Sequence, residues 1–72
     1  MLNAHETQLI LERFFSDCYN CWLRYCKDER EAYANAINDI EDTKRDPFSP
    51  QGEWLDEETR AKFIKYKKQN LG

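Results

Sequence analysis

Hydrophobic and polar positions follow a helical period over most of the chain. From Ala4 to about Lys27, a rotation of about 100° per residue gathers the apolar side chains on one half of the helical circumference. These side chains are Ile10, Leu11, Phe14, Phe15, Cys18, Tyr19, Cys21, Trp22, Tyr25 and Cys26. Asn3 and Glu6 form a variant of the capping box. We therefore predict a first helix over about residues 4–27 with its N-cap at Asn3.

The following segment has the same signals on a smaller scale. Asp28 and Glu31 repeat the capping pattern, which predicts a second helix over about residues 29–43. Its apolar stripe is narrow and has 3,4 spacing. The stripe consists of Ala32, Tyr33, Ala36, Ile37 and Ile40. No Gly or Pro separates the two segments, so one continuous helix is the alternative, but the second cap favours a tight turn.

A segment with two prolines then ends the helical pattern. Pro47 and Pro50 disfavour helix at the residues before them, which predicts a loop over residues 46–55. The run from Lys44 to Pro50 also has the basic-x-x-Pro-x-x-Pro spacing of ligands for polyproline-binding domains. A stiff connector between helices, with Phe48 and Trp54 as packing anchors, is the interpretation that we favour.

A third helix is predicted over about residues 57–69, after Asp56 as N-cap, with acidic residues in its first turn. Its apolar stripe is interrupted by Arg60, Lys67 and Lys68. Seventy-two residues suffice for one small domain, which spans residues 1–72. The expected fold is an all-α three-helix domain, in which the long first helix is central and the second returns antiparallel to it.

The first helix carries more apolar surface than two narrower helices can cover. We therefore expect part of its aromatic face to bind a protein partner. The residues expected at this surface are Leu9, Phe15, Tyr19, Trp22 and Leu23. The alternative is that the loop folds over this face with Phe48, Trp54 and Leu55.

Charge is unevenly distributed, with a net charge of −3. Residues 1–59 carry 14 acidic and 6 basic side chains, whereas residues 60–72 carry five basic side chains and no acidic one. The basic set is Arg60, Lys62, Lys65, Lys67 and Lys68, and these side chains could contact the phosphates of a nucleic acid. An acidic face of Asp39, Glu41 and Asp42 would instead steer the chain toward a basic partner. The overall acidity argues against a dedicated nucleic-acid binder, and a solvated face of the second helix is the simpler interpretation of the acidic residues.

The spacing of the cysteines and the histidine predicts neither a metal site nor a catalytic site. Cys18, Cys21 and Cys26 lie on one straight helix, and His5 lies about 20 Å from Cys18 along its axis, so they cannot close a tetrahedral zinc site. We expect no metal and no cofactor, and we expect the cysteines to pack as small apolar side chains. With His5 as the only histidine, in a terminus, we also expect no catalytic residues and no enzyme.

These features together predict a type of function. An odd number of cysteines favours free thiols and hence a cytoplasmic location. No run approaches the roughly 18 apolar residues of a membrane span, so we expect no membrane partner. We expect a small acidic accessory protein or inhibitor, of the kind that phages and mobile elements carry. It would bind a protein partner that the sequence does not identify, or itself as a homodimer. The alternative is a nucleic-acid-associated regulator that uses the basic third helix.

Overall fold

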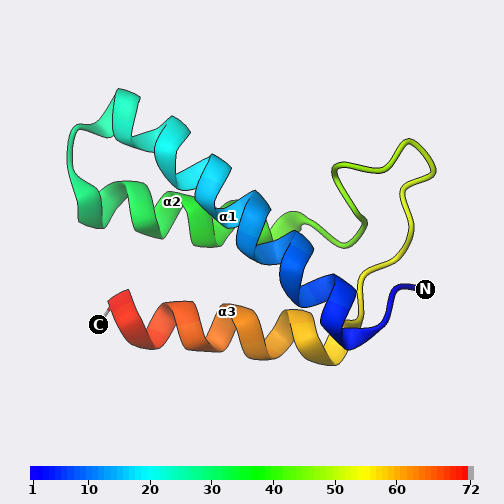
Figure 1. The fold of residues 1–72 in the computed structure, drawn as a ribbon. Coiled ribbons are helices and arrows are strands. Elements are labelled where there is room, and N and C mark those ends of the chain that lie inside the picture. Colours follow the sequence, from blue (N-terminus) through cyan, green and yellow to red (C-terminus); the bar gives the residue numbers. More distant parts are fainter. Residues whose placement is uncertain (72) are drawn as a thin grey trace.

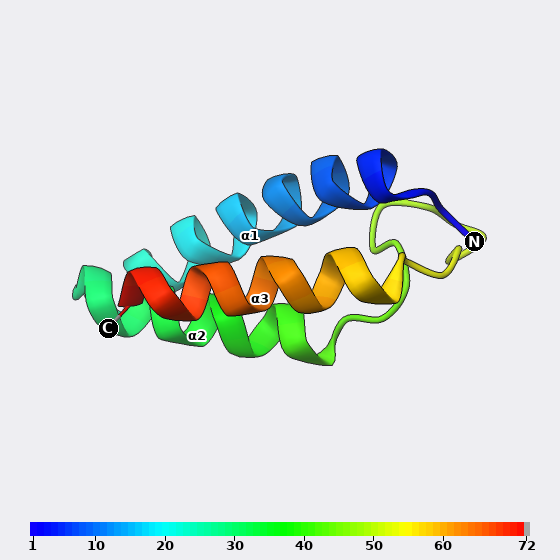
Figure 2. The same ribbon diagram turned by 90° about the horizontal axis from the view of Figure 1, so that it is seen from below.

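Three helices make up the fold in a computed structural model that describes residues 1–71. They are α1 (Ala4–Cys26), α2 (Glu29–Asp42) and α3 (Glu57–Leu71). The helix α2 returns along α1, and after the loop α3 runs back beside both (Figure 1). Viewed from below, the three helices lie side by side, with the loop and the N-terminus at one end (Figure 2). The predicted all-α three-helix fold is thus confirmed, and every helix end lies within two residues of its expected position.

The turn between α1 and α2 is built by the capping residues. Lys27 adopts the left-handed conformation, with φ 56°, and its N–H donates to the carbonyl of Leu23 over 3.2 Å. The carboxylate of Asp28 then accepts the N–H of Arg30 over 3.0 Å and starts α2. A left-handed residue cannot continue an α-helix. The two helices are therefore separate, as the second cap predicts.

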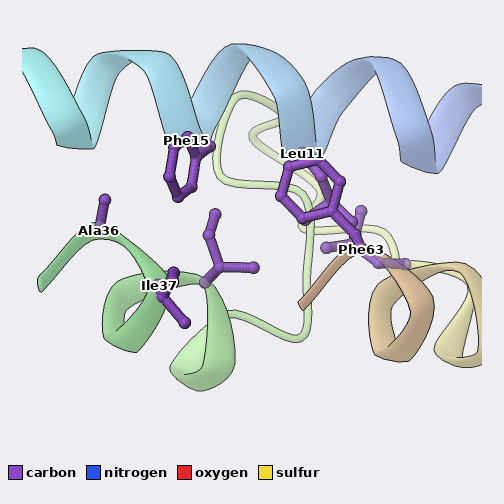
Figure 3. Packing of buried hydrophobic residues seen from close by; sticks show 7 residues of the cluster. Leu11, Phe15, Ala36, Ile37 and Phe63 are labelled. Atoms are coloured by element: carbon purple, nitrogen blue, oxygen red, sulfur yellow. The ribbon is translucent and has the colours of Figure 1, made fainter. Parts of the chain in front are cut away.

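The core lies between the three helices. Phe15 of α1 meets Phe63 of α3 edge to face, with ring centroids 6.1 Å apart, and meets Tyr33 of α2 at 5.1 Å. Figure 3 shows Leu11 and Phe15 directed from α1 toward Ala36 and Ile37 of α2 and toward Phe63. The complete buried cluster is Leu11, Phe15, Ala36, Ile37, Ile40, Leu55 and Phe63. All three helices therefore contribute to one apolar core.

The loop between α2 and α3 has an ordered structure of its own. Arg45 and Trp54 form an antiparallel bridge, and the guanidinium of Arg45 lies 4.3 Å from the centre of the Trp54 ring. The chain reverses near Gly52, whose φ of +60° suits glycine. Turns at 47–48 and 50–51 break up the proline-containing run, so it does not have the extended form of a polyproline ligand.

This loop folds back over the N-terminal half of α1. The Phe48 ring lies edge to face against Phe14, at 6.1 Å, and the guanidinium of Arg13 lies 4.3 Å from the Phe48 ring centre. Near the N-terminus, the N–H of Leu2 donates to the carbonyl of Trp54 over 2.9 Å. Of the three side chains expected to cover the aromatic face, Phe48 contacts Phe14 and Leu55 enters the core, whereas Trp54 stays 49% exposed beside Arg45.

A buried hydroxyl ties the start of α1 to the start of α3. Thr7 is fully buried, and its Oγ1 accepts the N–H of Asp56 over 2.9 Å. The Asp56 carboxylate accepts from the N–H and the hydroxyl of Thr59, as expected of an N-cap. These bonds hold the pKa of Asp56 below its usual value.

Among residues 1–71, no helix is both long enough and apolar enough to cross a lipid bilayer.

Candidate protein-interaction surface

The aromatic face expected on the first helix is divided between the core and the surface. Phe15 is only 7% exposed and belongs to the core. Tyr19 packs against that core, with its ring stacked on Phe15 at 6.4 Å. The burial of Phe15 corrects its place in the expected surface, whereas Tyr19 is only half-buried and keeps part of its ring at the surface. The physical reason is that α2 and α3 both converge on this part of α1.

The other three expected residues lie apart from one another. Trp22 is half-buried, and its Nε1 donates to the Asp39 carboxylate of α2 over 2.8 Å. Leu23 is half-buried, and Leu9 is 54% exposed. With about 100° per residue, Leu9 lies on the side of α1 opposite the core, away from the aromatic residues. The five residues therefore do not form one continuous patch.

The C-terminal half of α1 nevertheless presents an exposed surface, which we call the α1 strip and define as Asp17, Cys21, Arg24 and Tyr25. All four side chains are exposed, and Tyr25 reaches 77%. The Tyr25 ring lies against Trp22 with centroids 6.2 Å apart. Figure 1 shows that this half of α1 lies away from the loop. The helical pattern had placed Cys21 and Tyr25 on the apolar half of the helix. Both are exposed because the loop packs on the N-terminal half of α1 and does not reach them.

The cysteines differ in their surroundings. Cys18 is half-buried against the core, and burial together with the nearby Asp39 carboxylate raises its pKa to about 11. Cys26 is half-buried, and its Sγ accepts from the Asn35 amide at 3.5 Å. Cys21 is exposed, which corrects the expectation that all three pack in the core. Within residues 1–71 no group of three or more His, Cys, Asp or Glu side chains is placed to hold a metal ion.

The expected acidic face is also divided. Asp39 points to α1 and binds Trp22, whereas Glu41 points to α3 and pairs with Lys68 at 2.6 Å. Asp42 remains exposed. Positions two apart on a helix do not face the same way, and this separates Asp39 from Glu41. Two of the three carboxylates therefore have partners within the fold.

Arg60, which the sequence suggested as a nucleic-acid contact, is instead a buried structural residue. It is 6% exposed, and its guanidinium donates to the main-chain oxygens of Thr43 at 2.6 Å and Glu41 at 2.5 Å. Its third contact is an ion pair with Glu57 at 3.2 Å. All of these partners lie in the same chain. Arg60 is therefore removed from the set of phosphate contacts.

The remaining cations of α3 point in several directions. Lys62 pairs with Glu58 at 3.1 Å on the exposed side, and the Lys67 ammonium lies 4.6 Å from the centre of the Phe15 ring. Lys65 is exposed and lines an open groove of about 670 Å³ between α2 and α3, together with Lys68. The apolar floor of this groove is provided by Ala61 and Ile64. The basic side chains thus form no single cationic face.

Neither a scan against models of protein families nor searches of curated proteins and of solved structures found a match.

Proposed function

We propose that this chain is a non-enzymatic protein-interaction domain that binds through the α1 strip. The observation that carries the proposal is the exposure of Tyr25 beside Trp22 on the part of α1 that the loop leaves open. Tyrosine and tryptophan are enriched at the energetic centres of interfaces, and here the two rings lie against each other.

The support for Tyr25 is rigid, which favours binding. The indole of Trp22 is held by its hydrogen bond to Asp39, and the Tyr25 ring rests against that indole. A tyrosine side chain has few rotatable bonds, so immobilising it at an interface costs little conformational entropy. This arrangement supports an accessory or inhibitor role for a small acidic protein. The three free thiols support a reducing compartment such as the cytoplasm.

A nucleic-acid-associated regulator is the second candidate, and it has less support. Arg60 is buried, Lys67 covers aromatic rings, and Lys68 is paired with an acid. Lys62 and Lys65 are exposed, and Lys62 is paired with Glu58. Binding to a phosphate backbone needs several cations that act together, because each neutralised phosphate contributes one increment of affinity.

The test compares two exposed tyrosines. Tyr25→Ala removes the centre of the strip, and Tyr66→Ala removes a ring that is 60% exposed on α3 and serves as the matched control. Each variant is used as bait in the cells of origin, after circular dichroism has shown unchanged helix content. We expect the protein captured by the wild type to be lost with Tyr25→Ala and kept with Tyr66→Ala. The reverse pattern would overturn the proposal. Salt-dependent retention on nucleic acid that disappears in Lys62→Glu/Lys65→Glu would favour the second candidate.

A further inference from the structure

Charges of opposite sign stand at the two ends of the α1 strip. Asp17, Cys21 and Arg24 follow the i, i+4, i+7 spacing of one helical seam, and Tyr25 lies one turn after Cys21. With about 100° per residue, the four side chains fall within an arc of about 100°. They therefore lie on one side of the helix, with the carboxylate of Asp17 at one end, the guanidinium of Arg24 and the Tyr25 ring at the other, and the Cys21 thiol between them.

Neither charge has a salt-bridge partner within the fold. In the part of the chain that the structure describes, residues 1–71, neither Asp17 nor Arg24 takes part in an ion pair. They cannot pair with each other along α1, because seven residues of helix separate them by about 10 Å. Both charges are exposed and remain available to groups outside the chain.

We propose that the α1 strip binds a second copy of this chain, with the two α1 helices antiparallel about a two-fold axis that passes near Cys21. This inference rests on the proposed function and names its partner. Asp17 lies about 6 Å before Cys21 along the helix, and Arg24 lies about 4.5 Å after it. A two-fold axis at Cys21 therefore brings Asp17 of each copy opposite Arg24 of the other, within the reach of a flexible arginine.

The order of charges selects this arrangement over its alternatives. Parallel helices in register would place Asp17 beside Asp17 and Arg24 beside Arg24, which repels at both ends. An antiparallel pair makes the same contact twice, as a two-fold interface requires. It also brings the two Cys21 thiols together at the axis, with a Tyr25 ring on either side. The strip is thus complementary to itself.

The first experiment is sedimentation equilibrium over about two decades of micromolar protein concentration, since one helix strip gives a small interface and a weak dimer. We expect wild-type protein to dimerise reversibly. Asp17→Arg and Arg24→Asp alone should each weaken the dimer about tenfold or more, because each puts like charges face to face twice. The double variant Asp17→Arg/Arg24→Asp restores opposite charges and should return to within about threefold of wild type.

The second experiment uses the thiol at the axis. Diamide takes two electrons and two protons from a pair of thiols and joins them as a disulfide. We expect it to cross-link wild-type protein and Cys18→Ser/Cys26→Ser into covalent dimers in native buffer, and to form no covalent dimer of Cys21→Ser. Cross-linking through Cys18 or Cys26 would contradict an axis near Cys21.

The two proposals can fail separately. A monomer at every concentration, or a dimer that is indifferent to both charge reversals, overturns the antiparallel pairing. If a different protein is then still captured in a Tyr25-dependent way, the interaction function stands without the second copy. If the charge reversals leave self-association unchanged and Tyr25→Ala changes neither self-association nor capture, both proposals are wrong.

Discussion

The Nε of Arg60 donates to the main-chain oxygen of Thr43 over 2.6 Å, so a side chain of α3 caps the C-terminus of α2. The last carbonyls of a helix lack partners within the helix, and the C-terminal end of its dipole favours a cation. Arg60 supplies hydrogen-bond donors and a positive charge, and a second guanidinium nitrogen donates to the carbonyl of Glu41. The contact joins α2 and α3 in addition to their packing in the shared apolar core.

Replacing Arg60 should therefore destabilise the fold markedly. We expect Arg60→Met to lower the free energy of unfolding by about 2–4 kcal/mol, because two buried carbonyls lose their donors. The free energy of unfolding of Arg60→Lys should lie between those of the wild type and Arg60→Met, since an ammonium cannot reproduce the planar fork of donors. Urea unfolding followed by circular dichroism measures both. Lys62→Met, which removes an exposed ion pair, is the control and should change stability by less than about 1 kcal/mol.

The buried hydroxyl of Thr7 offers a test of nearly constant shape. Thr7→Val keeps the side-chain volume but leaves the N–H of Asp56 without its acceptor. We expect the free energy of unfolding to fall by about 1–2 kcal/mol. Thr7→Ser retains the hydroxyl and should recover the hydrogen bond at the expense of one methyl group. Equal stability of the wild type and the valine variant would show that this bond contributes nothing.

Lys27 offers a stabilising substitution. Its φ of 56° is unfavourable for any residue with a Cβ and natural for glycine. We expect Lys27→Gly to raise the free energy of unfolding by about 0.5–1 kcal/mol. Ser16→Gly, in the exposed middle of α1, should lower it by about 0.5 kcal/mol, because glycine is a poor helix former. Thermal unfolding of both variants is a direct comparison, and a loss of stability in Lys27→Gly would contradict the left-handed cap.

Cys18 should give the protein a specific response to alkali. Burial and the Asp39 carboxylate raise its pKa from 9.0 to about 11, so the folded state keeps the proton over a range in which the unfolded chain releases it. The resulting stabilisation is complete below about pH 9 and is lost as the pH rises toward about 11. We expect Cys18→Ser to reduce this decline in the free energy of unfolding. An unchanged decline would exclude Cys18 as its source.

The same difference between thiols should appear in their reactivity. Only the thiolate reacts with iodoacetamide, so the exposed Cys21 should be alkylated well before Cys18 at mildly alkaline pH. Peptide mapping of partly labelled, folded protein distinguishes the two sites. Denatured protein is the control, in which both thiols should react at similar rates. Faster labelling of Cys18 in the folded protein would contradict its raised pKa.

Local signals in the sequence were sufficient to define the helices. Asn3 and Asp28 accept the hydrogen bonds that their N-cap positions predict, and Asp56 does the same for α3. The roles of single charged residues were not accessible in this way. In the sequence, Arg60 is one of several cations in the third helix. Its partners are main-chain carbonyls at the end of another helix, and they cannot be identified from residue types. No pattern of side chains marks such carbonyls.

The sequence predicted which helix carries the candidate surface, but only partly which of its residues are exposed. Periodicity identified α1 as the helix with spare aromatic surface, and Trp22 and Tyr25 both lie on its apolar half. Which of those residues stay exposed depends on Phe48, whose contact with Phe14 sets where the loop's cover lies on α1. That contact joins residues far apart in the sequence and depends on the exact path of a loop, which helical periodicity does not describe.

The bond between Thr7 and Asp56 spans 49 positions, so the first turn of α1 must wait for most of the chain to leave the ribosome before it finds its partner. By then α1 and α2 have both emerged and can pair as a hairpin. Phe15 packs against Tyr33 in that hairpin, but the cluster that it forms with Ile37 is incomplete until Phe63 is added. A fragment that ends after α2 would thus expose apolar surface that chaperones and proteases recognise. Synthesis of α3 is the step that buries this surface.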